Sequence, residues 1–258
     1  MENKKVANIK LAKKKLIPTF DLFENSWQIY RANFKSLISI SLYGLLGLGV
    51  IVVGVALISG LVVFLNVKGD GSLVMNIILG ILIVLVAAAT IALAIWYSTR
   101  SKIGTYLLIK NDFKSVKESW EDSKELFWPF FWLSLLVAVF VILWSFLLII
   151  PGLVFAVFSS FAILLFIFNG QTGMKAIVAS KALVKGYWWA VFGRFAFLFL
   201  VFYLFSLVLG LPNSFMEENS APSNIWGMIS SIGIFLVSPF LYVYSILLFK
   251  NITEVKNN

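Results

Sequence analysis

Long apolar runs without charged residues are the feature that most constrains this chain. A helix that crosses a bilayer needs about 20 consecutive apolar residues. Apolar residues make up 60% of the sequence and charged residues only 13%, whereas soluble domains have about 45–50% and about 25%. This composition excludes a soluble globular enzyme. The uncharged runs are Ser36–Val67, Gly71–Thr99 and Leu126–Phe168, and two further runs, Tyr187–Leu211 and Ile225–Phe249, hold one charge, Arg194.

The runs predict an all-α, polytopic membrane protein with six transmembrane helices. The third run is too long for one span, and Pro151-Gly152 divides it into a hairpin. Pro239 lies inside the sixth run, where we expect a kink and not a break. We expect spans at about 37–67, 72–99, 126–150, 152–170, 187–211 and 225–249. A basic tail (1–17) precedes the membrane domain (18–252), and a short tail (253–258) follows it.

The basic residues predict how the chain is threaded. Nineteen of the 21 Lys and Arg residues lie on one side of the predicted spans, Lys68 lies on the other, and Arg194 lies within the fifth span. The positive-inside rule then places both termini in the cytoplasm, and we expect the membrane to be the bacterial inner membrane. Nucleic-acid binding is not expected, because no loop is long enough to form a folded nucleic-acid-binding domain.

Three segments that precede spans resemble one another, at 20–34, 113–127 and 174–188. Ser26, Ser119 and Ser180 align, and each is followed eight residues later by an aromatic residue. The aromatic residues of the first segment have the spacing of one face of an amphipathic helix. We expect Thr19 to cap the first helix and Ser115, with Glu118 at capping-box spacing, to cap the second. The aromatic side chains either anchor interfacial helices at the cytoplasmic head groups or pack beneath the bundle as core. The candidate anchors are Trp27, Tyr30, Trp120, Trp188 and Trp189.

These features resemble a known family, over residues 18–252. The shared pattern comprises a Ser-Trp helix, an Ile150-Pro151-Gly152 turn, a helix with Gly173, Ile177, Ser180, Leu183 and Gly186 before Trp188-Trp189, and an ending from Ser238-Pro239-Phe240 to Lys250. It is similar to the bacterial membrane domain attached to some glycerophosphodiester phosphodiesterases and often found alone. The resemblance implies a six-helix bundle and favours lipid-related work. It does not imply hydrolysis, because the family's catalytic domain is a separate soluble barrel.

The spans hold few groups that could carry chemistry. They contain no Asp or Glu, and the whole chain has no His and no Cys, which argues against an enzyme, a proton-driven carrier and a metal or cofactor site. Arg194 is the exception: its long side chain either snorkels to the cytoplasmic interface or binds a lipid phosphate. With Lys181 and Lys185, it is our candidate for contact with an anionic lipid.

The sequence therefore predicts a non-enzymatic integral membrane protein that interacts with lipids or serves as an accessory or membrane-organising component. Its expected partners are membrane lipids, including anionic ones, and either another membrane protein or further copies of itself. The alternative is a small transporter or channel for an uncharged or lipid-like solute. A hydrated cavity at mid-membrane favours transport, whereas a lateral groove favours lipid binding.

Overall fold

The computed structural model describes residues 16–67, 73–217 and 220–257. Regular structure in these ranges is helical, with helices α1 to α10 and the short 3-10 helix η2, and it includes no strand. Six of the described helical segments are long and apolar enough to cross a membrane. The chain is thus a multi-pass membrane protein, and the predicted all-α architecture is confirmed. The segments are Phe34–Val63, Met75–Lys110, Phe127–Phe146, Ile149–Asn169, Trp188–Phe215 and Ala221–Asn257.

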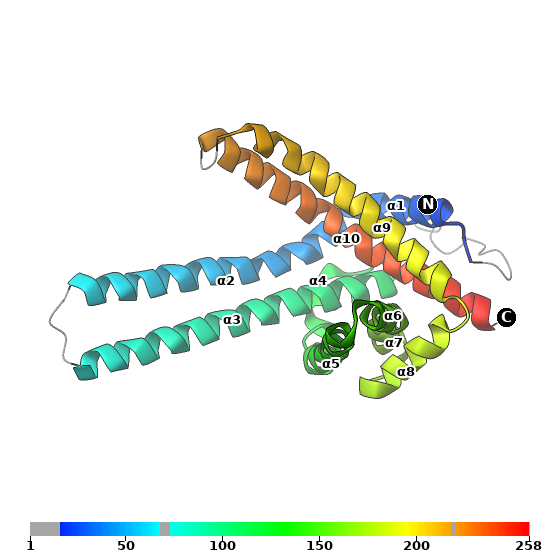
Figure 1. Cartoon of the computed structure of the whole chain (residues 1–258), viewed down its shortest axis with the longest axis horizontal. Helices are drawn as coiled ribbons and strands as arrows, with labels where there is room; N and C mark the ends of the chain where they lie inside the picture. The colour runs from blue at the N-terminus through cyan, green and yellow to red at the C-terminus, as the bar shows by residue number, and fades with distance from the viewer. Residues whose placement is uncertain (1–15, 68–72, 218–219, 258) are drawn as a thin grey trace. The chain divides into compact units, whose positions relative to one another are not determined.

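The helices group into two compact units (Figure 1). Of the described residues, unit 1 contains those up to Ile38 and those from Trp128 onward. Unit 2 is the segment Ser39–Phe127.

Unit 2 is a long pair of helices with a short helix packed against one end. It comprises most of α2 (Phe34–Val67), then α3 (Leu73–Lys110) and α4 (Val116–Asp122). α3 continues well beyond Thr99, where the predicted second span ends, because Ile103, Leu107 and Leu108 give its last turns a buried face. Several basic residues that the sequence suggested for a loop therefore lie on this helix.

A tight turn joins α3 to α4. Asp112 and Phe113 have positive φ angles of 51° and 59°. Ser115 then caps α4, because its hydroxyl oxygen accepts a hydrogen bond from the Glu118 backbone N–H at 3.2 Å. This cap was expected from the spacing of the two residues, and the structure confirms it.

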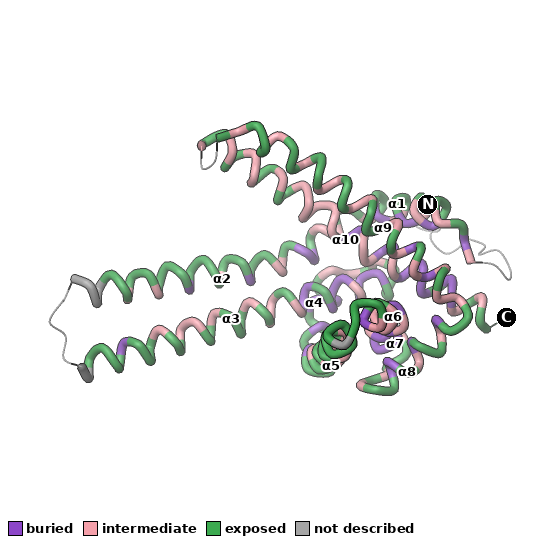
Figure 2. The backbone as a smooth tube through the Cα atoms, viewed as in Figure 1, coloured by how far each residue is buried: buried purple, intermediate pink, exposed green. Residues whose placement is uncertain are grey.

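Burial in unit 2 is concentrated where α4 packs (Figure 2). Ile40, Leu108 and Trp120 form a small core there. The remainder of α2 and α3 exposes large aliphatic side chains such as Val52 and Val84. In a membrane protein such surfaces face lipid, so this pair needs no large core of its own.

Unit 1 contains all the other helices. α1 (Thr19–Ala32) begins with Pro18 at the N-cap position, and Thr19, which was expected to be the cap, is already inside the first turn. The prediction for Thr19 is therefore wrong, and Pro18 contributes only its carbonyl, which accepts from Leu22 N–H at 2.9 Å. The others are α5 (Phe127–Leu147), α6 (Ile149–Ser159), α7 (Ala162–Asn169), α8 (Gly173–Val184), α9 (Trp188–Gly210), η2 (Leu211–Phe215) and α10 (Ala221–Asn257).

The helix break in the long third run precedes Pro151-Gly152. Leu148 has extended backbone angles and separates α5 from α6, so that Pro151 lies in the first turn of α6, where a missing N–H costs little. Gly152 packs against α5: a Cβ there would lie 2.0 Å from Ser145 Oγ. The glycine permits the two helices to approach each other closely.

The segment predicted as the fourth span is divided again. α6 ends at Ser159 and α7 begins at Ala162, with Phe161 outside helical geometry. The side chain of Ser180, on α8, serves both sides of this break. Its oxygen accepts from Phe161 N–H at 3.1 Å, and its hydroxyl donates to Phe158 O at 2.7 Å. α7 then ends in a left-handed Gly170, as expected for a helix C-cap.

The proline in the last span leaves α10 continuous. Pro239 has no N–H to offer the Phe235 carbonyl, and the Ser238 hydroxyl donates to that carbonyl at 2.9 Å. This side chain replaces the missing backbone bond, as lipid surroundings require. α10 reaches Asn257, so the described part of the segment predicted as a tail is helical.

Candidate functional site

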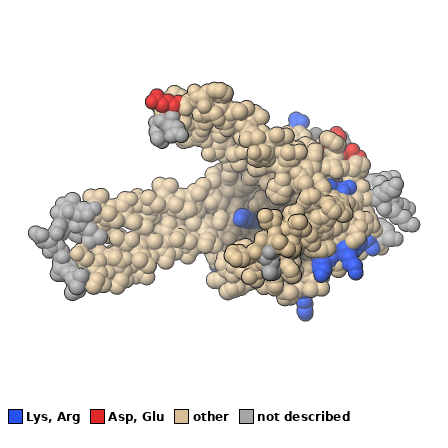
Figure 3. Space-filling view, in the orientation of Figure 1, with Lys and Arg blue, Asp and Glu red and all other residues tan. Residues whose placement is uncertain are grey.

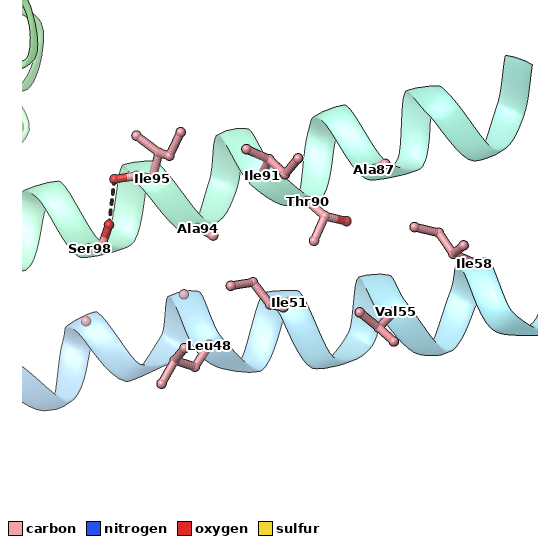
Figure 4. A pocket seen from close by; sticks show the side chains of 12 residues that line it. Leu48, Ile51, Val55, Ile58, Ala87, Thr90, Ile91, Ala94, Ile95 and Ser98 are labelled. Carbon is pink, nitrogen blue, oxygen red and sulfur yellow. Dashed lines mark hydrogen bonds between the residues drawn. The ribbon is translucent and has the colours of Figure 1, made fainter. Parts of the chain in front are cut away.

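Unit 2 has an apolar crevice between α2 and α3 (Figure 4). Its volume is about 500 Å³, which lies within the range of small-molecule sites. Aliphatic side chains from both helices line it and are drawn in Figure 4. They include Leu48, Ile51 and Val55 on α2, and Ala87, Ile91 and Ala94 on α3.

The two hydroxyl groups of this crevice are engaged within α3. Thr90 Oγ1 donates to Val86 O at 2.7 Å, and Ser98 Oγ donates to Ile95 O at 3.2 Å. Each hydroxyl has one proton, so neither has a second to offer a ligand. The lining can therefore select an apolar chain by shape, and it offers little for a polar solute.

Glycines set the distance between the two helices. A Cβ at Gly54 would lie 2.2 Å from Thr90 Oγ1, and one at Gly47 would lie 3.1 Å from Ala94 O. Gly44 is similarly close to Ser101, whereas a Cβ at Gly49 would meet nothing within 4 Å. Gly44, Gly47 and Gly54 therefore permit close contact between the helices, and the first two line the crevice.

Trp120, one of the candidate anchors, packs inside unit 2. Its ring stacks on Tyr43 at 4.6 Å and lies nearly parallel to Tyr97 at 6.2 Å. The Arg100 guanidinium lies 4.1 Å from the ring centroid and donates to Trp120 O at 2.7 Å and to Ser123 Oγ at 3.1 Å. Trp120 thus follows the core-packing alternative and attaches α4 to α3.

The aromatic stripe of α1 packs within unit 1. Tyr30 is buried, its hydroxyl donates to Leu236 O on α10 at 2.6 Å, and burial raises its pKa above the usual value of 10.0. Trp27 stacks on Tyr30 at 5.3 Å but stays partly exposed. It lines a smaller apolar cavity of about 170 Å³ together with Phe23 and Phe240.

At the start of α9, Trp188 packs within unit 1, whereas Trp189 is exposed. Trp188 stacks on Phe192 at 5.2 Å, and its Nε1 is 3.4 Å from Val154 O on α6. Trp189 is 77% exposed. Of the candidate anchors, Trp189 has the most exposed side chain, and an anchoring role for it stays a prediction.

Arg194 holds the N-terminal segment of unit 1 in place. It is only 9% exposed, and its Nη1 and Nη2 donate to Ala190 O at 2.9 Å and to Ile17 O at 2.5 Å. The Ile17 N–H donates to Asn251 Oδ1 on α10 at 2.9 Å. The backbone of Ile17 is therefore held on both sides, by α9 and by α10. We call this arrangement the Ile17 clamp.

The predicted lipid-contact residues fall into two environments. Arg194 belongs to the clamp, and its guanidinium donates to the backbone carbonyls of Ala190 and Ile17. Both lysines are exposed, on the last turns of α8 and just after it. Sequence reasoning missed Ile17 and Asn251, because no local pattern connects two residues at opposite ends of the chain.

Comparisons with known proteins add no relative. No protein-family model, curated protein or solved structure matches the chain. Among the described residues, no group of three or more His, Cys, Asp or Glu side chains is placed to hold a metal ion.

Proposed function

We propose that this protein is a non-enzymatic membrane protein that binds membrane lipid, with the α2–α3 crevice receiving an acyl chain. The crevice is the observation that carries the proposal. It is apolar, and its hydroxyl protons are used inside α3. Voids lined by apolar atoms lose dispersion contacts, which a flexible hydrocarbon chain restores. The resemblance to a membrane domain that accompanies phosphodiesterases of lipid-derived substrates favours the same reading.

The proposed location is the bacterial inner membrane, with both termini in the cytoplasm. The lysine distribution in the sequence supports this orientation. Unit 1 follows the same polarity, because Glu217 lies by the α9–α10 connection while Lys250 and Lys256 lie toward the other end of α10.

A photo-crosslinking experiment tests the acyl-chain site. The full-length protein is reconstituted with a phospholipid that carries a diazirine in its tail, irradiated, and mapped by mass spectrometry. We expect crosslinks to concentrate on crevice residues such as Ile51 and Ile91. Ala87→Phe fills part of the crevice and should reduce those crosslinks severalfold. Ala88→Phe is the matched control, because Ala88 is exposed and outside the lining.

Two results would count against the proposal. Crosslinks spread evenly along the lipid-facing surfaces of α2 and α3, and unchanged by Ala87→Phe, would show that the crevice has no preference for the chain. Saturable uptake of a solute into proteoliposomes would favour the transporter alternative.

A further inference from the structure

The outer face of α8 combines apolar and basic side chains. Met174, Val178, Lys181 and Lys185 recur at spacings of three and four, which places them on one side of the helix. Met174 is 51% exposed, Val178 is 61% exposed, and both lysines are exposed. The opposite side is buried and includes Ser180, which holds the α6–α7 break. The helix is therefore fixed on one side and open on the other.

A third lysine joins this face from α10. Lys256 Nζ donates to the carbonyl of Ala182, so the end of α10 lies beside the last turn of α8. Lys181 lies over the Phe158 ring, with its Nζ 5.8 Å from the centroid. We call Lys181, Lys185 and Lys256 the lysine cluster. Figure 3 shows basic side chains gathered over α8 and the adjoining end of α10.

Among the described residues, no carboxylate neutralises the charge of this cluster. Each side chain is exposed, and none forms an ion pair with a carboxylate in the described part of the chain. The negative end of the α8 dipole accounts for part of the preference for cations here. The dipole does not account for three ammonium groups, because Lys256 by itself already donates to a carbonyl in the last turn of α8.

The apolar neighbours indicate what the cluster faces. Val178 and Met174 lie about one and two turns before Lys181 on the same exposed side, and Trp189, at the start of α9, is 77% exposed. Exposed aliphatic residues and lysines on one helical surface are typical of the boundary between acyl chains and head groups, where an exposed tryptophan such as Trp189, on the next helix, is also common. A soluble acidic partner would not require the apolar part of the face.

We infer that the outer face of α8, together with Lys256, binds the head groups of anionic phospholipids. The inference rests on the proposed lipid-binding function and names the lipid class for a second site. The lysine cluster contacts the phosphate and the net negative charge, while Met174 and Val178 contact the adjoining acyl region. Arg194 takes no part, because its side chain is committed to the Ile17 clamp.

Native mass spectrometry of the full-length protein tests the inference. The protein, in a neutral detergent, is mixed with equal amounts of phosphatidylglycerol and phosphatidylcholine, and the retained lipids are counted. We expect phosphatidylglycerol to dominate. Lys181→Gln, Lys185→Gln and Lys256→Gln together should lower that preference by up to about fivefold for each lysine. Glutamine keeps a donor for the Ala182 carbonyl, so the fold should persist.

The matched control removes the same charge elsewhere. Lys102, Lys114 and Lys117 are exposed residues of unit 2, and replacing all three with glutamine should leave the preference unchanged. An equal loss in this control, or an unchanged preference in the cluster variant, overturns the inference. Displacement of phosphatidylglycerol by equimolar inorganic phosphate also overturns it, because the site would then bind free phosphate.

The two proposals can fail separately. If crosslinking in the α2–α3 crevice persists while the cluster variant keeps its preference, only the head-group site is refuted. If crevice crosslinking fails while the cluster variant loses phosphatidylglycerol, only the acyl-chain site is refuted.

Discussion

Ser180 shows how one hydroxyl group can stabilise an irregular membrane segment. The break between α6 and α7 frees a donor and an acceptor, and the buried Ser180 side chain bonds to both. Unpaired backbone groups are costly where water is absent. The aligned Ser26 is equally buried, but its hydroxyl donates to Leu22 O within α1.

We therefore expect Ser180→Ala to destabilise the protein by about 1–3 kcal/mol, because it leaves Phe161 N–H and Phe158 O without this partner. Ser26→Ala should cost much less, since Leu22 O keeps its place in a regular helix. Thermal unfolding of both variants in the same detergent measures the difference. Equal losses of stability would refute the bridging role of Ser180.

For single residues, the sequence indicated which positions are important but did not indicate their roles. Alignment of the three segments drew attention to Ser180, yet nothing local indicates that its partners are on another helix. Arg194 was the conspicuous charge in a span, and both suggested roles looked outward to lipid. In the structure its side chain points inward and donates to the Ile17 carbonyl, and this contact exists only because the chain folds back on itself.

Among the elements, the approach of α2 to α3 depends on Gly54. A methyl group there would lie 2.2 Å from Thr90 Oγ1 and 2.9 Å from Thr90 Cβ, so a rotamer change alone does not make room. We expect Gly54→Ala to cost about 1–3 kcal/mol of stability by forcing the helices apart. Gly49→Ala is the control, because nothing lies within 4 Å of that position.

Gly49→Ala should be neutral or slightly stabilising, since alanine favours the helix. Chemical unfolding of both variants in mixed micelles compares them, and an equally stable Gly54→Ala variant would show that the glycine is not needed for the contact. Combining Gly54→Ala with Thr90→Ala should recover part of the loss, because the clashing Oγ1 and Cγ2 atoms are then gone.

The elements themselves were predictable to different degrees. The six long apolar helices were predictable, because a span must be long enough to cross the lipid and the sequence shows apolar runs of that length directly. The break expected at Pro151-Gly152 lies at Leu148, just before the proline that marks it, and the break at Phe161 was not predicted, because no proline or glycine lies there. The side-chain partner that makes the second break tolerable comes from α8.

For the whole molecule, the distribution of charge predicts the threading. Glu217 follows η2, at the connection between α9 and α10, whereas Lys117 lies on α4 in the predicted cytoplasmic region between spans two and three. Both residues are exposed and described in the structure. The chain has no cysteine of its own, so a single introduced thiol reports its own side of the membrane.

We expect Glu217→Cys to react with a membrane-impermeant maleimide in intact cells, and Lys117→Cys to react only after the cells are opened. The physical reason is that lysine-rich segments stay on the cytoplasmic side during insertion, while the α9–α10 connection, without a basic residue, is translocated. Labelling of Lys117→Cys in intact cells would show that the chain is threaded in the opposite orientation. The lysine cluster on α8 would then face the opposite leaflet, so this experiment also decides which leaflet must supply the anionic lipid.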